Sequence, residues 1–367
     1  MTAPASRAGW RGGQGPPGRP RRSLVTGGAG FIGSHLVDLL LARGDIVAVV
    51  DDLSTGRRDN LTRARESAGP GRLRVIEADL ARTLDGALAN ECFDEVYHMA
   101  AAVGVRRILQ RPIESIETNV VQTAAVLRFV AGHRQRGTAM PATLIASSSE
   151  VYGKSAKTPF SEEDDCVYGP TTAVRWSYAA TKAIDEYLAL AWRESAGLPV
   201  VVVRFFNTVG PRQVGDYGMV LPNFIAAALA GEPLPVHGDG RQTRTFCDVR
   251  DAAPALLRLL ADPACHGRVF NLGSEQSVEM QELAEVVVRT LGSRSTIARV
   301  PYDDAFPGTG GGFEDLRHRR PDLARIRAAI GFEATIPIEV TIRDIAGALE
   351  RRGDVAAAGG GGSGARA

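Results

Sequence analysis

The sequence predicts an α/β protein built on a doubly wound parallel sheet, followed by a smaller C-terminal substrate-binding region. Up to Phe205, short β-rich runs alternate with segments long enough to be helices. A glycine-rich turn follows the first β-rich run, as expected for a βαβ unit. Beyond Phe206 the strand-like runs become sparser, while Pro, Gly and charged turns multiply. This change in pattern predicts that the second region covers the ligand rather than extending the sheet.

The expected elements follow from the apolar pattern. The runs with the composition of buried strands are Leu24–Val25, Ile46–Val50, Leu73–Ile76, Val96–His98, Thr143–Ala146 and Val200–Phe205. The clearest helix-length segments are Phe31–Arg43, Ile116–Val130 and Tyr178–Ser195. Strands that alternate with helices form parallel sheets covered on both faces, and such sheets bind ligands at the carboxyl ends of their strands.

The turn after the first strand has a glycine at every third position. Gly27, Gly30 and Gly33 permit a tight turn, close approach of the backbone to a pyrophosphate, and close packing of the following helix. Asp51 follows 18 residues after Gly33, at the end of the second strand, where a carboxylate can accept both hydroxyls of an adenosine ribose. This arrangement predicts a Rossmann-type dinucleotide site. The carboxylate favours NAD over NADP, and Arg57 and Arg58 leave NADP as the alternative.

A second motif places a phenol and an amine on one helix face. Tyr178 and Lys182 are one turn apart near the start of a predicted helix. An ammonium group and a positive nicotinamide ring beside the phenol both favour the phenolate, so we expect the pKa of Tyr178 to move towards the working pH. Tyr178 is then a candidate general base.

A polar loop follows the Thr143–Ala146 strand, at its carboxyl end. Ser148 in this loop can donate a hydrogen bond to the substrate oxygen that Tyr178 deprotonates. Glu150 places a carboxylate in the same predicted cleft. The alternative is a polar loop that only caps the next turn.

Composition and charge exclude several other classes of protein. The formal net charge is +1, but residues 1–22 carry five arginines and no acid, so the rest of the chain is net acidic and ill suited to nucleic acid. No apolar run approaches the roughly 20 residues that span a bilayer. The four cysteines are scattered, which favours free thiols in the cytoplasm over disulfides or a metal site. We expect a disordered basic arm at 1–22, an NAD-binding domain at 23–205, a nucleotide-sugar-binding region at 206–352 and a flexible tail at 353–367.

Taken together, the motifs resemble those of the extended short-chain dehydrogenase/reductases that modify nucleotide sugars. The resemblance rests on TGGAGFIGSHL, DDLSTG, VYHMAA, SSSEVYG, the Tyr-x-x-x-Lys pair, RFFNTVGPR and HGDGRQTRTF, and runs from about Ser23 to Leu349. It implies NAD contacts at Gly27, Gly30, Phe31, Ile32, Gly33, Asp51, Asp79, Leu80, Tyr178 and Lys182. It implies catalytic roles for Ser148, Ser149, Glu150, Tyr178, Lys182 and Arg319, and substrate contacts at Asn207, Asn223 and Arg244. It also implies a homodimer with a four-helix interface, for which Ile116–Val130 and Tyr178–Ser195 are the candidates.

Within that family, the Ser149-Glu150 pair most resembles the UDP-glucuronate decarboxylases. The 4,6-dehydratases carry Asp-Glu at this place, and typical 4-epimerases carry Ala-Thr. Arg319, two residues before Pro321, is similar to an arginine of the decarboxylases. The approach to the tyrosine, Arg175-Trp176-Ser177, further resembles the decarboxylase of the aminoarabinose pathway.

The implied reaction begins with oxidation of the sugar at C4. The 4-keto acid then loses carbon dioxide and is reprotonated at C5, which gives UDP-4-keto-pentose, and return of the hydride gives UDP-xylose. One departure is Ile108, which stands where xylose-forming relatives carry a tyrosine that contacts the sugar carboxylate region. Arg106 and Arg107 lie close by in the sequence, and the alternatives are that they replace this substrate contact or that they are solvated surface charges. The alternatives are a 4-epimerase acting on UDP-glucuronate or a neutral UDP-sugar, a 4,6-dehydratase, and a non-catalytic NAD-binding sensor. The sequence leaves open whether the nucleotide is UDP or dTDP.

Overall fold

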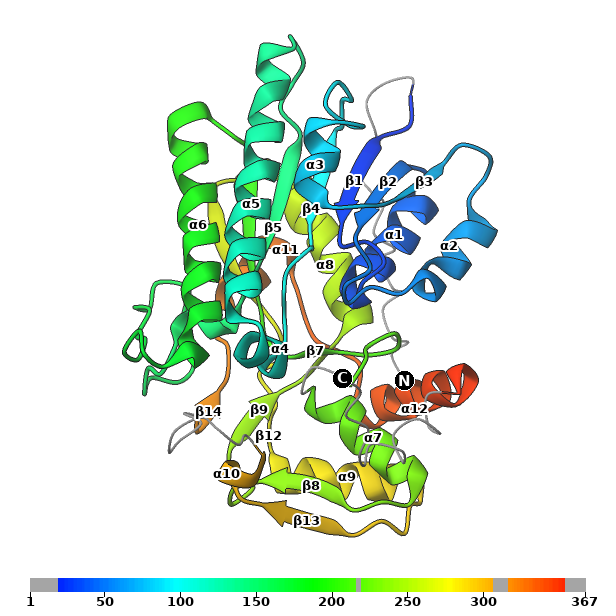
Figure 1. Ribbon diagram of the computed structural model, residues 1–367, viewed down its shortest axis with the longest axis vertical. Coiled ribbons are helices and arrows are strands. Elements are labelled where there is room, and N and C mark those ends of the chain that lie inside the picture. The colour runs from blue at the N-terminus through cyan, green and yellow to red at the C-terminus, as the bar shows by residue number, and fades with distance from the viewer. Residues whose placement is uncertain (1–18, 216–218, 306–315, 354–367) are drawn as a thin grey trace, which may run out of the picture.

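A seven-stranded parallel sheet forms the centre of the protein (Figure 1). The computed structural model describes residues 19–215, 219–305 and 316–353. The strands of this sheet are β1 (Arg22–Thr26), β2 (Ile46–Asp51), β3 (Leu73–Glu77), β4 (Glu95–His98), β5 (Ala142–Ser148), β6 (Val200–Phe205) and β11 (Arg268–Leu272). Their order is β11-β6-β5-β4-β1-β2-β3, so the direction of winding reverses between β1 and β4. That reversal opens a crevice at the carboxyl ends of the two strands.

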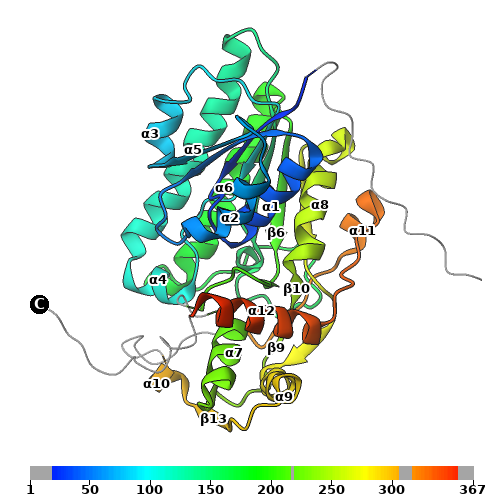
Figure 2. The same cartoon turned by 90° about the vertical axis from the view of Figure 1, so that its right-hand side faces the viewer.

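Helices cover both faces of the sheet (Figure 2). Successive strand residues point to opposite faces, so that Val25 belongs to one apolar cluster and Leu24 to the other. One face packs on α1 (Phe31–Arg43), α2 (Thr62–Ser67), α8 (Val249–Ala261) and α11 (Ala324–Ile330). The other packs on α3 (Leu80–Asp85), α5 (Pro112–Gln135) and α6 (Ser177–Ala196). The predicted doubly wound fold is therefore confirmed.

A smaller region below the sheet has a core of its own. This core is formed by α7 (Val220–Ala230), α9 (Met280–Leu291), α12 (Ile338–Arg352), β8 (Leu234–His237) and β13 (Ile297–Val300). Short strands join it to the sheet: β7 (Thr208–Val209), β9 (Thr243–Thr245), β10 (Cys247–Asp248), β12 (Ser277–Glu279) and β14 (His318–Arg319). The short helices are α4 (Val105–Gln110), α10 (Tyr302–Ala305), η1 (Arg58–Leu61), η2 (Ser149–Tyr152), η3 (Val174–Trp176) and η4 (Pro263–Cys265).

The strand β11 is the main difference from the predicted fold. It comes from the part of the chain that we expected to cover the ligand, yet it pairs in parallel with β6 along the edge of the central sheet. Its residues Arg268–Leu272 follow a Gly-containing turn and offer only a short apolar run. The helices α8 and α11 flank the sheet on the same side, so a second stretch of the chain returns to complete the fold.

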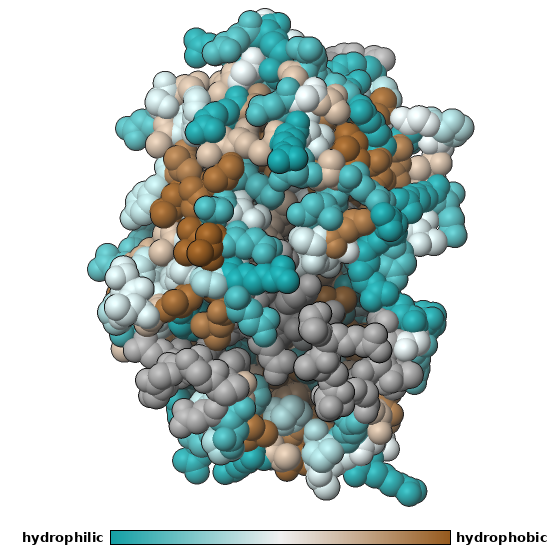
Figure 3. Space-filling view, in the orientation of Figure 1, coloured by the Kyte–Doolittle hydropathy of each residue, from teal (hydrophilic) through white to brown (hydrophobic). Residues whose placement is uncertain are grey.

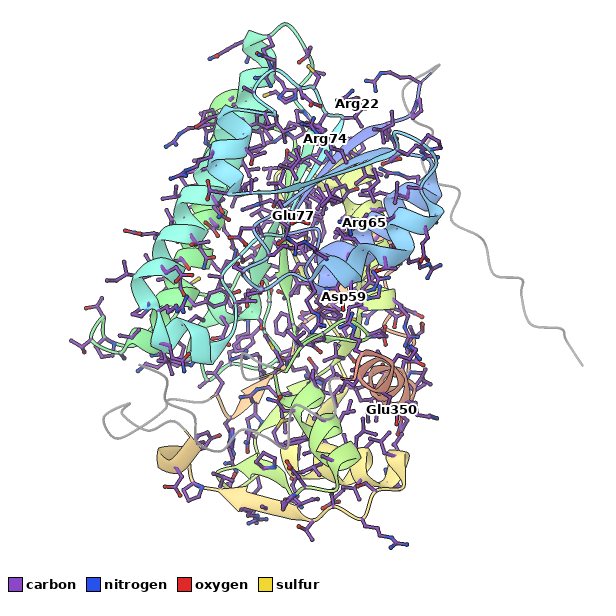
Figure 4. All side chains as sticks on the ribbon, turned by 45° about the vertical axis from the view of Figure 1, so that its right-hand side comes forward. Arg22, Asp59, Arg65, Arg74, Glu77 and Glu350 are labelled. Carbon is purple, nitrogen blue, oxygen red and sulfur yellow. The ribbon has the colours of Figure 1, made fainter. Side chains whose placement is uncertain are left out.

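The opposite edge of the sheet is charged (Figure 4). On β3, Arg74 and Glu77 are exposed, and Arg74 Nη1 lies 2.5 Å from Glu91 Oε1. Arg65 of α2 lies 4.0 Å from Glu77. Charged side chains along an exposed edge strand oppose pairing with another chain.

The described chain begins inside the predicted basic arm. Arg19 binds both carboxylate oxygens of Asp94, and Arg22 is the first residue of β1. The rest of the arm and all of the predicted tail except Gly353 lie outside the described residues. None of the helices in the described part combines the length and apolar character needed to cross a membrane.

Candidate functional site

A cavity of about 530 Å³ lies between the carboxyl ends of the strands and the smaller region. All but two of the predicted site residues line it. They are Gly27, Gly30, Phe31, Ile32, Gly33, Asp51, Leu80, Ser148, Ser149, Glu150, Tyr178, Lys182, Asn207, Asn223, Arg244 and Arg319. The two exceptions are Asp79, whose carboxylate accepts a hydrogen bond from the Arg82 amide and so caps α3, and Arg106 in α4, whose side chain lies outside the described residues.

The glycine-rich turn packs with almost no clearance. Gly27 has φ +66°, and a Cβ there would lie 2.7 Å from the Ala100 amide nitrogen. A Cβ on Gly33 would lie 2.1 Å from the Gly27 carbonyl oxygen. Only glycines allow this contact, which brings the N-terminus of α1 to the floor of the cavity. The N–H groups and partial positive charge of that terminus suit a pyrophosphate.

Asp51 ends β2 beside this turn and is held by backbone amides. Its Oδ2 accepts a hydrogen bond from Ala29 at 2.8 Å, and its Oδ1 accepts one from Leu53 at 2.9 Å. Burial raises the pKa of Asp51, and these amide bonds act in the opposite direction. The side chain still lines the cavity, where it can accept ribose hydroxyls. The turn, the helix terminus and this carboxylate fit an NAD molecule.

The two arginines that left NADP open are both engaged elsewhere. The Arg57 guanidinium lies 3.1 Å from Asp59, and the Arg58 guanidinium binds Glu77. Neither residue lines the cavity. This geometry favours NAD, because a 2′-phosphate beside Asp51 would meet a carboxylate instead of a guanidinium.

Tyr178 and Lys182 lie side by side on the first turns of α6. Lys182 is 2% exposed, and its Nζ donates to the Ala146 carbonyl at 2.9 Å. Burial lowers the pKa of Lys182, but the charges of Asp185 and Tyr178 outweigh burial and leave it raised. Lys182 therefore carries a full positive charge next to the phenol.

The acidity of the Tyr178 phenol differs from our expectation. Burial raises its pKa above the ordinary value, while the Lys182 ammonium and a hydrogen bond with Ser148 act against that rise without overcoming it. The lysine therefore acts in the predicted direction, but desolvation of the buried phenolate is the larger effect in the protein alone. The prediction also counted on the positive nicotinamide ring, and for the complex with NAD it stays a prediction.

Ser148 ends β5 and caps the short helix η2, whose second residue is Glu150. The Ser148 hydroxyl accepts a hydrogen bond from the Glu150 amide at 3.2 Å, which fixes the serine at the edge of the cavity beside Tyr178. The loop does cap a turn, as the alternative interpretation supposed. It also presents a hydroxyl to the site.

The Glu150 carboxylate lies between two guanidinium groups. Its Oε1 is 2.6 Å from Arg319 Nη1, and its Oε2 is 2.7 Å from Arg175 Nη1. Burial would raise the pKa of Glu150, but the two arginines overcome burial and hold it well below its usual range. Glu150 is thus an ionised carboxylate that organises two cations and not a ready proton donor.

Arg319 and Arg244 reach the cavity from neighbouring strands. They are register partners in the parallel pair of β14 with β9. Arg244 Nη1 donates to the Leu316 carbonyl at 2.8 Å, and Asn207 Nδ2 donates to the Thr245 carbonyl at 3.0 Å. Ile108, the residue in place of a tyrosine, is 3% exposed and lines the same cavity. The smaller region thus places two guanidinium groups, those of Arg244 and Arg319, on its side of the cavity.

Two residues near Tyr178 were not assigned a role from the sequence. Arg175 precedes Tyr178 by three residues, and this spacing was the signal that could have found it. Asp185 follows Lys182 by three residues and lies 3.1 Å from its Nζ. Each forms a buried ion pair, Arg175 with Glu150 and Asp185 with Lys182. The sequence does not reveal such pairs.

Comparison with known proteins identifies the family of this chain. Residues 23–273 match the NAD dependent epimerase/dehydratase family. The chain is 38% identical to a UDP-N-acetyl-alpha-D-glucosaminuronate decarboxylase of Bacillus cytotoxicus, over 88% of this chain and 96% of that protein. It is 36% identical to UDP-glucuronic acid decarboxylase 2 of Arabidopsis thaliana, over 91% of this chain and 70% of that protein.

Solved structures show the same fold. The UDP-N-acetylglucosamine 4-epimerase of Methanobrevibacter ruminantium, in complex with UDP-N-acetylmuramic acid, is 29% identical, with a TM-score of 0.78 over 91% of this chain and 99% of that one. The UDP-glucose 4-epimerase of Thermus thermophilus, in complex with NAD, is 27% identical, with a TM-score of 0.75 over 90% and 99%. The chain belongs to the NAD-dependent epimerase/dehydratase family, and its cofactor is NAD.

Proposed function

We propose that this enzyme decarboxylates UDP-glucuronate, giving UDP-4-keto-pentose, UDP-xylose or both. The observation that carries the proposal is the buried group of Arg175, Glu150 and Arg319 beside Tyr178. Two guanidiniums against one carboxylate leave a net positive charge in the cavity, and a uronate brings the matching negative charge. The decarboxylases of Bacillus cytotoxicus and Arabidopsis thaliana, which act on such sugars by name, support it.

In this proposal the glycine-rich turn and Asp51 would hold NAD, and the bound nicotinamide would supply the hydride acceptor for C4 of the sugar. Tyr178 accepts the proton of the C4 hydroxyl as a phenolate, which the Lys182 ammonium stabilises, and becomes a neutral phenol. Ser148 donates a hydrogen bond to the C4 oxygen. The bond from C5 to the carboxylate then breaks, its electron pair moves onto the C4 carbonyl oxygen, and carbon dioxide leaves.

Arg319, Arg175 and Glu150 act on the carboxylate side of the sugar. The guanidiniums orient the carboxylate, and Glu150 keeps them in place. Since Glu150 is ionised, the proton that returns to C5 is assigned to Tyr178, to Arg319 or to solvent and not to Glu150. Asn207, Asn223 and Arg244 are proposed to bind the nucleotide diphosphate, because guanidinium and amide groups suit paired phosphates. Arg106 is proposed to replace the missing tyrosine contact near the sugar carboxylate.

A second candidate substrate is UDP-N-acetylglucosaminuronate. The relative from Bacillus cytotoxicus acts on this sugar by name. Its sequence is 38% identical to this chain, and the match covers 96% of that protein. The two substrates differ at C2 and share the C5 carboxylate and the C4 hydroxyl. The same residues therefore perform the same chemistry on either of them.

The test is to incubate the purified enzyme with NAD and each uronate, and to follow carbon dioxide, NADH absorbance and product mass. We expect carbon dioxide from at least one uronate. Carbon dioxide without net NADH identifies a UDP-pentose product, and carbon dioxide with equal NADH identifies a released ketone. Tyr178→Phe serves as the control and should bind NAD without turnover. A new sugar of unchanged mass would instead establish a 4-epimerase and contradict the proposal.

We also propose that the enzyme is a cytoplasmic homodimer. Apolar side chains gather on the face formed by α5 and α6 (Figure 3). Ile113 and Tyr187, one on each helix, are 73% and 71% exposed, which is unusual for large apolar residues unless a partner covers them. Two such helices from each subunit would form a four-helix interface. Free thiols at all four cysteines suit a reducing compartment.

A further inference from the structure

Beside the catalytic lysine, α6 carries a carboxylate that the mechanism above does not use. Asp185 is completely buried, and its Oδ2 lies 3.1 Å from Lys182 Nζ. The other oxygen, Oδ1, has no hydrogen-bond partner within the described part of the chain. A carboxylate this close to a buried ammonium interacts with it strongly, because little water screens the two charges. Asp185 is therefore placed to modify what the charge of Lys182 does.

The other charged groups around this pair are each compensated. Glu186 on the same helix binds Arg204 of β6, at 2.7 Å between Oε2 and Nη2. Glu150 of η2 is shared by its two arginines. Asp185 is therefore the carboxylate that acts directly on Lys182.

The faces of α5 and β4 add no charge. Burial raises the pKa of Asp185, while the Lys182 ammonium and a hydrogen bond with the Thr123 hydroxyl of α5 act against that rise. On β4, His98 Nε2 lies 3.1 Å from Thr123 Oγ1, and its Nδ1 lies 2.8 Å from Thr26 Oγ1. Burial lowers the pKa of His98 to about 3, with the Lys182 charge acting in the same direction, so this histidine is neutral at working pH.

Lys182 thus lies between two oxygen groups, of which one takes part in the proposed reaction and the other does not. On one side is the Tyr178 phenol, which must give up its proton to act as a base. On the other is Asp185, which shares the same ammonium. We propose that Asp185 is a positioning residue that divides the Lys182 charge with Tyr178 and so sets how readily the phenol acts as a base.

The consequence for acidity follows from the signs of the charges. A nearby ammonium stabilises a phenolate, and a nearby carboxylate destabilises it. Asp185 therefore raises the pKa of Tyr178 and opposes the effect of Lys182, in addition to the larger effect of burial. The same carboxylate raises the pKa of Lys182 and keeps it protonated when the phenol loses its proton. Asp185 therefore makes the Tyr178 phenol harder to ionise, and it also keeps Lys182 protonated at high pH.

The test is the pH profile of kcat/KM for Asp185→Asn. This inference rests on the proposed role of Tyr178 as the base. With the carboxylate removed, the acid limb should move by about one pH unit to lower pH, because the whole ammonium charge then acts on Tyr178. A loss of activity should also appear at alkaline pH, as Lys182 titrates at a lower pKa. Asp185→Glu restores a carboxylate and should return the limb towards that of the wild type.

The matched control is Glu194→Gln, which removes an exposed carboxylate from the same helix and should leave the profile unchanged. A second readout does not depend on turnover. The ultraviolet absorbance of tyrosinate is titrated in the wild type and in Asp185→Asn, each with and without Tyr178→Phe, and the difference reports the phenol directly. The Tyr178 transition should move to lower pH in Asp185→Asn. If that variant does not fold, Asp185→Ser is measured in its place with the same expectation.

Two results separate this inference from the proposed function. If wild-type enzyme releases carbon dioxide but Asp185→Asn keeps the wild-type acid limb and loses only stability, the carboxylate has a structural role and the inference is wrong. If no uronate is decarboxylated, the proposed substrate is wrong, and the tyrosinate titration still decides the role of Asp185.

Discussion

At the scale of single residues, the carboxylates of Asp51 and Glu150 line the cavity, and the partners of each determine its ionisation and what it can bind. Asp51 is held by backbone amides, which leaves it free to meet hydroxyl groups. Glu150 is held by two guanidiniums, which keeps it ionised. Residue type and order alone predicted that both line a cleft. They could not predict these partners, because Arg319 lies on β14, far along the chain.

Removing the Glu150 charge should destabilise the protein. In Glu150→Gln two buried guanidiniums lose their counter-ion, and breaking a buried pair in this way typically costs about 3–5 kcal/mol. Urea denaturation measures the loss. Glu163→Gln is the matched control, since Glu163 is 77% exposed and pairs with Arg325, so its loss should stay under about 1 kcal/mol. Equal losses in the two variants would contradict a buried ionic role for Glu150.

The same pair predicts how stability depends on pH. Because the pKa of Glu150 is lowered in the folded state, its contribution is present above the ordinary pKa of a glutamate and is lost as pH falls through the lower folded value. The difference in unfolding free energy between wild type and Glu150→Gln should therefore shrink in acid. Denaturation at neutral and acidic pH gives this difference directly.

At the scale of elements, the bounds of a helix or strand were predicted most accurately where nearby residues, such as capping glycines, mark its ends. The helix α1 was predicted with its observed bounds, because Gly30 precedes it and Gly44 ends it in a left-handed conformation with φ 106°. The helix α5 was predicted too short, since polar residues such as His133 and Gln135 hide its last turns. The strand β11 was missed because its partner β6 is distant in sequence, and nothing local reports that pairing.

The exposed face of α5 and α6 gives a prediction for assembly. Tyr187→Asp places a charge in the proposed four-helix interface, where it would be buried without a partner. We expect this variant to be monomeric by light scattering, while the wild type is dimeric. Val340→Asp changes an exposed apolar residue on α12, 36% exposed and remote from that face, and should remain dimeric. A wild type that is monomeric at all accessible concentrations would contradict the proposed dimer.

At the scale of the whole molecule, the C-terminal helix reaches back to the cofactor site. In Figure 2, α12 lies between the sheet and the helices of the smaller region. Arg352, in its last turn, donates to Asn60 Oδ1 at 2.5 Å. Asn60 in turn donates through Nδ2 to the Ala29 carbonyl at 2.8 Å, inside the glycine-rich turn. A contact made by the last residue of α12 therefore supports the glycine-rich turn between β1 and α1.

This connection predicts that a substitution in α12 weakens NAD binding. Arg352→Met keeps most of the apolar stem and removes the hydrogen bond to Asn60, which should loosen the turn around Ala29. A lost hydrogen bond of about 1 kcal/mol corresponds to a roughly fivefold higher Kd for NAD. Titration calorimetry measures this Kd, with Arg351→Met, an exposed neighbour on the same helix, as the control. If both variants bind NAD as tightly as the wild type, then the glycine-rich turn is held by its own packing, and α12 contributes to the smaller region alone.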